Sequence, residues 1–212
     1  MNSRPGVETL PPDEIERRSF EIIEKELPHS LDPELSPIIK RVIHATADFD
    51  YADNLCFSER ALESGIAALM AGEHIVTDTN MAKSGINKSA LKRLKSEVLC
   101  YMADEDVALT AKKNNLTRAE VSMDKAATLP GRPIFAVGNA PTALIRIYEL
   151  INDGRLRPSL VIGAPVGFVN VIQSKELILR TRTPYIVARG RKGGSAVAAA
   201  VINALMFSIT KN

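Results

Sequence analysis

The feature that most constrains the fold is a repeated alternation in the C-terminal part of the chain. A short unbroken apolar segment, a turn that contains glycine and a helical segment follow one another three times, over residues 132–151, 158–179 and 183–208. Unbroken apolar strands that alternate with helices are typical of a parallel sheet covered on both faces. The sequence therefore predicts an α/β fold with a predominantly parallel sheet flanked by helices.

The part of the chain before residue 130 predicts mainly helices. A helix capped by Asp32, with Pro33 in its first turn, carries a periodic apolar stripe and places His44 near its C-terminal end. Further helices are expected over residues 13–26, 58–70, 88–95, 104–113 and 117–127, and short strands over residues 74–78 and 97–102.

Composition favours one globular domain. The 212 residues are 45% hydrophobic and 25% charged and contain no linker, so we expect a flexible lead over residues 1–12 and a single domain over residues 13–212. The net charge of +2 and the lack of Trp argue against a nucleic-acid partner. Two isolated cysteines, no signal-like N-terminus and no apolar run of about 20 residues indicate a cytoplasmic protein without a membrane span.

The glycine-containing turns are the first candidates for a ligand site. They begin at Gly138, Gly163 and Gly190, and in a parallel sheet they lie at the carboxyl ends of strands, where α/β proteins bind ligands. Glycine in any one of them also permits a tight connection. The last turn adds Arg191 and Lys192 at a helix start, which indicates a seat for a carboxylate or phosphate. The sequence thus predicts a ligand crevice at this edge of the sheet.

Several common sites are missing from the sequence. The chain contains no GxxxxGK[ST] loop and no GxSxG elbow, none of its turns supplies GxGxxG after a strand, and its histidines are too far apart for a zinc site. We therefore expect neither a metal nor a cofactor. His44 fits either a structural histidine at a helix end or a catalytic group, and the polar segment 78–87 fits either a solvated turn or a binding loop.

Five segments, read together, carry a resemblance to a known family. They are RVIHATADFDYADNLCFS, IVTDTNMAKSGIN, FAVGNAPTAL, LVIGAPVGFVNVIQSKE and ARGRKGGSAVAAA. In this order they closely resemble the precorrin-8X methylmutase family, also called precorrin isomerase, which includes cobalt-precorrin-8 methylmutases. The resemblance runs from about residue 19 to about residue 205. It implies an α/β homodimer with the pocket near the subunit interface, for which the alanine-rich helix expected over residues 195–209 offers a close-packing surface.

The resemblance also implies an activity, that of an isomerase. Family members move a methyl group from C11 to C12 of precorrin-8X or cobalt-precorrin-8, giving hydrogenobyrinate or cobyrinate in cobalamin biosynthesis. The histidine that matches His44 is the family's proposed proton donor to a ring nitrogen. Protonation makes the ring framework more electrophilic, and an imidazole suits this role because it titrates near neutrality. The sequence does not distinguish between the two substrates, because both present the same carboxylate rim.

The substrate of such an enzyme is a flat macrocycle edged with carboxylates. Its pocket needs apolar walls and several cationic or amide partners at the rim, although any one surface cation can also be merely solvated. On the resemblance, the substrate-binding candidates are Arg17, Ser19, Arg41, Thr79, Asn80, Met81, Arg118, Asn139, Lys192 and Gly193, with Asp48 as a candidate partner of His44.

Two other functions agree with parts of the sequence. A nucleotide-dependent oxidoreductase would use the three strand–turn–helix units, although GxGxxG is missing. A carrier that binds a tetrapyrrole without transforming it would use the same basic rim and would not need His44.

Overall fold

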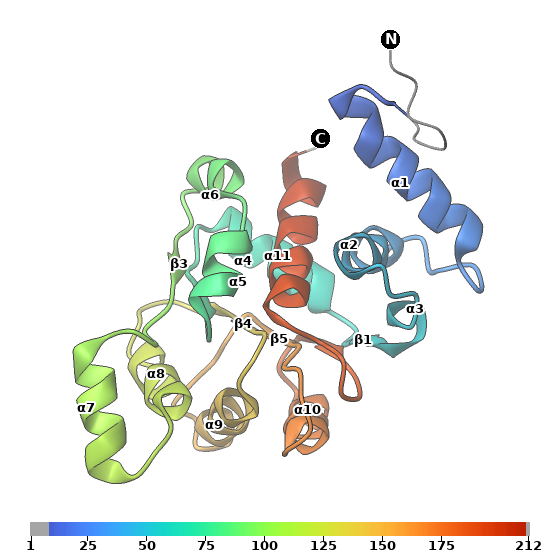
Figure 1. The fold of residues 1–212 in the computed structure, drawn as a ribbon. Coiled ribbons are helices and arrows are strands. Elements are labelled where there is room, and N and C mark those ends of the chain that lie inside the picture. Colours follow the sequence, from blue (N-terminus) through green and yellow to red (C-terminus); the bar gives the residue numbers. More distant parts are fainter. Residues whose placement is uncertain (1–8, 211–212) are drawn as a thin grey trace.

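A central sheet organises the computed structural model, which describes residues 9–210 (Figure 1). Its strands are β1 (Leu55–Phe57), β2 (Ile75–Thr77), β3 (Val98–Leu99), β4 (Ile134–Val137), β5 (Leu160–Gly163) and β6 (Tyr185–Ala188). Within the described residues these six strands lie in the order β1-β6-β5-β4-β2-β3. β1 runs antiparallel to β6, and the other neighbours are parallel. The predicted α/β fold with a predominantly parallel sheet is confirmed, whereas β1 was not foreseen.

The strand order defines a switch point between β2 and β4. The chain passes from β2 outward to β3 and then returns to add β4, β5 and β6 on the other side of β2. In doubly wound sheets of this order, the connections diverge at such a point and leave a crevice at the carboxyl ends of the strands. The predicted ligand crevice therefore has its geometric counterpart between the ends of β2 and β4.

Helices cover both faces of the sheet (Figure 1). Alternate strand residues point to opposite faces, so Ile134 and Ala136 join one core while Phe135 and Val137 join the other. One face carries α2 (Ser36–Thr46), α4 (Ala61–Met70), α5 (Asn80–Gly85), α6 (Lys88–Leu94) and α11 (Ser195–Thr210). The other carries α8 (Arg118–Ala126), α9 (Pro141–Asn152) and α10 (Val171–Leu179), with α7 (Glu105–Asn114) packed on α8.

α11 lies at the centre of its face and packs against α2, α4 and α5 (Figure 1). Its side chains Val197 and Val201 are fully buried. The approach to α5 is so close that a Cβ added at Gly85 would stand 3.0 Å from the Cβ of Ala199. The alanine-rich sequence of α11 is therefore explained by packing within the chain and does not require a subunit interface.

The N-terminal helix α1 (Pro12–Glu26) lies along α2 at one side of the molecule (Figure 1). Its side chain Ile23 is buried. Ion pairs also join it to α2, between Glu16 and Arg41 at 2.6 Å and between Glu24 and Lys40. The expected lead over residues 1–12 lies, as far as residue 8, outside the described residues and stays a prediction.

Local predictions need correction at three places. α2 begins only at Ser36, because the carboxylate of Asp32 accepts a hydrogen bond in the preceding turn instead of capping the helix. The helix expected from residue 58 begins at Ala61, because the Ser58 hydroxyl accepts the Tyr185 amide at the sheet edge. The polar segment 78–87 contains the short helix α5, whose first turn is capped by the preceding threonine hydroxyl.

Candidate active site

A carboxylate of the chain itself closes the crevice at the switch point. Asp78 follows β2, is fully buried and accepts the N–H groups of Gly138, Asn139 and Ala140 at 2.7, 2.8 and 2.6 Å. It therefore takes the anion-binding position at the start of α9. Burial raises the pKa of the Asp78 carboxyl group, and the amide hydrogen bonds oppose that rise. The turn of residues 138–140 therefore positions Asn139, but its backbone amides are bound by Asp78 and are not available to a ligand.

The turn after β6, residues 190–195, roofs the same point, and we call it the glycine turn. The N–H of Gly194 donates to the carbonyl of Ala164 at the end of β5, at 2.8 Å. The hydroxyls of Ser195 and Thr79 are hydrogen-bonded at 2.7 Å, which joins the start of α11 to the start of α5. Contacts within the chain thus hold the glycine turn over the carboxyl ends of the strands.

Lys192 ties the glycine turn to the segment that follows α2. Its ammonium lies 2.7 Å from the carboxylate of Asp48 and 2.5 Å from that of Asp50. The hydrogen bond between Lys192 and Asp48 is the first cause that raises the pKa of the lysine and lowers that of Asp48. The structure therefore pairs Asp48 with Lys192 and not with His44, four residues before it.

His44 is exposed on the last turn of α2. Its imidazole stacks on the ring of Phe20 from α1, with the ring centroids 5.2 Å apart and the planes at 13°. Within residues 9–210, neither ring nitrogen of His44 has a hydrogen-bond partner in the chain. The imidazole is thus held by stacking, and its ring nitrogens are available to hydrogen-bond a ligand.

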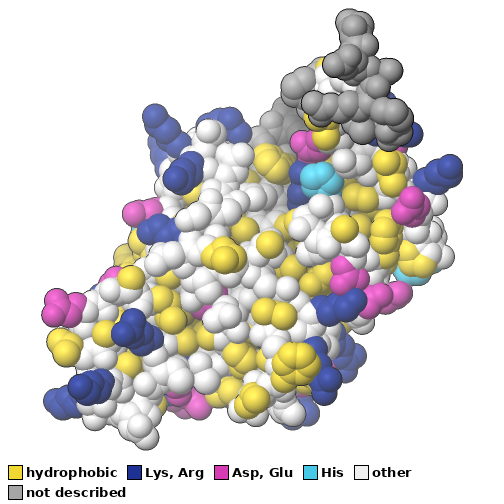
Figure 2. Space-filling view, in the orientation of Figure 1, with side chains coloured by type: hydrophobic (Ala, Val, Ile, Leu, Met, Phe, Trp, Pro, Cys, Tyr) yellow, Lys and Arg dark blue, Asp and Glu magenta, His cyan; other side chains and the backbone are white. Residues whose placement is uncertain are grey.

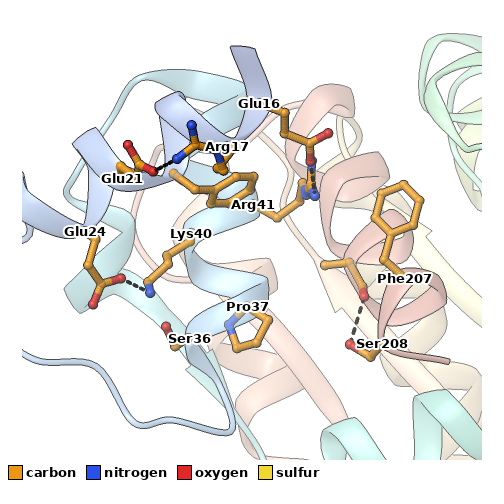
Figure 3. Close-up of a pocket in the computed structure, with 12 residues that line it drawn as sticks. Glu16, Arg17, Glu21, Glu24, Ser36, Pro37, Lys40, Arg41, Phe207 and Ser208 are labelled. Atoms are coloured by element: carbon orange, nitrogen blue, oxygen red, sulfur yellow. Dashed lines mark hydrogen bonds and ion pairs between the residues drawn. The ribbon is translucent and has the colours of Figure 1, made fainter. Parts of the chain in front are cut away.

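Figure 3 shows a pocket, whose volume is about 970 Å³. Phe20, whose ring stacks on His44, is among the residues that line it. The pocket lies between α1, α2 and the C-terminal turns of α11. The guanidinium of Arg41 stands between the rings of Phe20 and Phe207, at 4.8 and 5.0 Å from their centroids. The volume is near the upper end for small-molecule sites, and the aromatic walls suit a flat apolar ligand.

Charges in this pocket are balanced by carboxylates from α1. Figure 3 shows Arg17 with Glu21, Lys40 with Glu24, and Arg41 with Glu16. An anionic ligand would therefore have to compete with the glutamates for these cations. Displacing a glutamate costs least free energy where the ion pair is exposed, because exposed ion pairs are weak.

Apart from His44, most of the predicted site residues fall into two groups. Ser19 stands apart, because its hydroxyl donates to the carbonyl of Ile15 within α1 and it is not among the residues that line the pocket. Arg118 opens α8, whose start is bonded to that of α9 through Thr117 and Thr142 at 3.0 Å. At the carboxyl ends of the strands lie Thr79, Asn80, Met81, Asn139, Lys192 and Gly193, and in the pocket lie Arg17 and Arg41.

Exposed apolar side chains mark the surface next to the glycine turn. Between β5 and α10, Val166, Phe168 and Val169 are 48%, 83% and 78% exposed. Arg191 of the glycine turn lies over the Phe168 ring at 5.5 Å. Figure 2 shows hydrophobic side chains gathered in the area of α10. A patch of this kind is typical of a surface that meets another molecule.

Sequence reasoning missed four residues of this region. Asp78 had a usable signal, because a carboxylate directly after a buried strand lies at the carboxyl edge of the sheet. Lys175 of α10 donates hydrogen bonds to the carbonyls of Gly190 and Lys192 in the glycine turn. Its signal was weaker, a lysine among buried positions of a helix. Phe20 and Phe207 carry no local pattern, since their roles depend on how α1 and α11 flank α2.

These features define a doubly wound α/β protein with a closed switch point and a candidate acid–base group beside a large pocket. Within residues 9–210 no helix is long and apolar enough to cross a membrane, and no group of His, Cys, Asp and Glu is placed to hold a metal ion. The model of the precorrin-8X methylmutase family matches residues 14–208, and the chain belongs to this family.

Relatives and a solved structure agree with this assignment. A cobalt-precorrin-8 methylmutase of Priestia megaterium is 44% identical over 198 residues, which cover 93% of this chain and 88% of the relative. A precorrin-8X methylmutase of Pseudomonas aeruginosa is 38% identical over 194 residues, which cover 90% and 93%. A crystal structure of precorrin-8X methylmutase from Thermus thermophilus is similar with a TM-score of 0.87 at 40% identity, over 94% of this chain and 97% of that one.

Proposed function

We propose that this chain is an isomerase that moves the C11 methyl group of precorrin-8X or cobalt-precorrin-8 to C12, in cobalamin biosynthesis. Family membership supports the reaction. The observation that carries the mechanism is the position of His44, an exposed imidazole without a hydrogen-bond partner in residues 9–210. It stacks on Phe20, which lines a pocket of about 970 Å³. In its protonated form this imidazole donates a proton to a ring nitrogen, which favours the shift.

The basic candidates hold the carboxylates of the substrate in this proposal. Arg17 and Arg41 do so from the pocket, Lys192 from the carboxyl ends of the strands and Arg118 from the start of α8. Charge-assisted hydrogen bonds suit a ligand with many carboxylates. Exposed pairs such as Arg17 with Glu21 are readily exchanged for such a ligand, because surface ion pairs contribute little.

Two further parts of the proposal concern the state of the protein. A homodimer would cover apolar surface that the single chain leaves exposed, including Phe168 and Val169. A cytoplasmic location agrees with the two free cysteines, Cys56 and Cys100.

The comparisons give no support to an oxidoreductase or to a carrier. The geometry gives a separate reason against a dinucleotide. Its pyrophosphate would lie at a helix N-terminus near the switch point, where Asp78 already accepts the amides before α9.

The experiment that tests the proposal compares His44→Ala with the unaltered protein. Both are incubated anaerobically with metal-free and with cobalt-containing precorrin-8, and the absorbance change is followed as the methyl group migrates. We expect His44→Ala to lose about 100- to 10,000-fold in turnover, the range for removal of a positioned general acid. It should still bind hydrogenobyrinate, because the aromatic and basic walls remain.

His29→Ala is the matched control. His29 is also an exposed histidine, but its ring is hydrogen-bonded to Asp53, at 2.8 Å, away from the pocket. This variant should turn over at the unaltered rate. Near-native turnover by a folded His44→Ala protein would remove the proton-donor role and leave binding in the pocket as the source of catalysis.

A further inference from the structure

The glycine turn rests on a buried amine. Lys175 of α10 is fully buried, and its Nζ donates hydrogen bonds to the carbonyl oxygens of Gly190 and Lys192 at 2.8 and 2.7 Å. Its partners are main-chain carbonyls and not a carboxylate. Burial lowers the pKa of Lys175 to about 8. An amine is costly to bury, so the two hydrogen bonds must offset much of that cost.

These bonds act where the backbone has little rigidity of its own. Gly190 and Gly194 have φ values of +82° and +129°, which lie in the region that favours glycine. The Lys175 ammonium binds two carbonyl oxygens of this segment, which belong to residues two positions apart and face the interior. The side chain of Lys192 then points outward, where it is 50% exposed and pairs with Asp48.

The other end of this connection is the helix that carries the candidate acid. Asp48 follows α2, whose last turn contains His44. The chain of contacts therefore runs from the buried amine through the glycine turn and the Lys192 ion pair to the end of α2. A shift of the glycine turn would be transmitted to that end, because ion pairs need close approach.

We propose that Lys175 is a positioning residue for the reaction, which fixes the glycine turn so that Lys192 stays on Asp48 and holds the end of α2 beside the substrate. This inference rests on the proposed methyl-shift function. Lys175 itself does not touch the substrate, since it is buried beneath the turn.

Three variants separate this role from a general effect on folding. Lys175→Met keeps an unbranched side chain that is one atom shorter and removes its donors. Lys175→Gln is uncharged but keeps two N–H donors on one nitrogen, so it should restore part of the function. The matched control is Ser174→Ala, because Ser174 is the adjacent residue and is also fully buried. Among the described residues its hydroxyl bonds only to the carbonyl of Val171, in its own helix.

The first measurement is amide hydrogen exchange of the full-length chain, read by mass spectrometry on peptides that contain the glycine turn. Exchange there should be about 10-fold faster or more in Lys175→Met, intermediate in Lys175→Gln and unchanged in Ser174→Ala. Unchanged exchange in a folded Lys175→Met protein would overturn the proposal. So would failure of both Lys175 variants to fold, because the residue would then serve the whole core.

The second measurement is a double-mutant cycle with Lys192→Met, using kcat/KM on precorrin-8X under anaerobic conditions. Lys175→Met alone should lower kcat/KM about 10-fold or more, and in the Lys192→Met background it should add less than about twofold. Independent, multiplying effects would overturn the proposal, because Lys175 would not act through Lys192. If the unaltered protein does not turn over precorrin-8X, the proposed function is overturned. If it does, and the Lys175 and Lys192 substitutions act independently, only this inference is overturned.

Discussion

Substitution of Gly193 by alanine tests whether the roof over the switch point is as tight as the structure indicates. The backbone of Gly193 has no positive φ, so alanine is allowed by conformation. Space is the obstacle. An added Cβ would stand 2.2 Å from the carbonyl oxygen of Ala164 and 2.7 Å from that of Pro165, and both atoms belong to the backbone.

The magnitude follows from these contacts. A Cβ does not approach other heavy atoms within 3.0 Å, so the glycine turn must move by about 1 Å. Such a move also breaks the hydrogen bond from the Gly194 amide to the Ala164 carbonyl, now 2.8 Å long. Overpacking costs about 1 to 3 kcal/mol and the lost bond about 1 kcal/mol. For a chain of this size the sum lowers Tm by about 4 to 16 °C.

The assay is thermal unfolding followed by circular dichroism, with Gly154→Ala as the matched control. Gly154 has a φ of +69° and nothing within 4 Å of an added Cβ, so alanine there would be conformationally strained but would have space. Its replacement should cost about 1 kcal/mol. Gly193→Ala should be the more destabilising of the two. If Gly193→Ala melts at or above the temperature of Gly154→Ala, the close approach to β5 does not constrain the turn and the reasoning is refuted.

Other predictions concern the ionisable groups of the same region. Asp78→Asn loses at least one of its amide hydrogen bonds and should cost about 1.5 to 3 kcal/mol in urea unfolding. The control is Asp153→Asn, an exposed residue at the C-terminal end of α9, and equal loss in both variants would contradict this. The hydrogen bond from Lys192 holds the pKa of Asp48 below its usual 3.8, so its stabilisation is complete above pH 3.8 and disappears as the pH falls through the folded-state value. The free energy of unfolding of the unaltered protein should therefore exceed that of Asp48→Asn above pH 3.8 and approach it as the pH falls. A difference between the two proteins that does not change with pH would refute this. Between pH of about 8 and 10.5 the unfolded state holds more protons on Lys175 than the folded state does, so the stability of the unaltered protein relative to Lys175→Met should rise with pH; a flat difference would count against it.

Elements that depend on local pattern could be predicted from the sequence. The parallel strands and their helices follow from short apolar runs between turns, and the capping box at Thr117 and Glu120 marks the start of α8. β1 could not be predicted in the same way. It has three residues and owes its strand conformation to antiparallel pairing with β6, more than 120 residues later.

Contacts in the candidate site depend on tertiary structure and left little trace in the sequence. The sequence placed Lys192 in an anion-binding turn, but its ammonium pairs with Asp48, 144 residues away. The pattern of α1 and α2 placed His44 at a helix end without revealing the ring of Phe20 against it. Residue type and approximate location could thus be predicted, whereas the partners of each charged group could not.

The closed switch point has a consequence for where chemistry can occur. Doubly wound proteins commonly bind a ligand anion at the helix starts around this point. Here Asp78 occupies one such helix start, and the glycine turn with Ser195 covers the neighbouring strand ends. We therefore expect a large ligand to bind farther out, at the helices above the sheet, where His44 and Arg41 lie on α2. Because the interior of the crevice is filled by groups of the chain, it acts as a fixed support, and the proposed acid and the proposed substrate-binding cations are held by ring stacking and ion pairs at its edge.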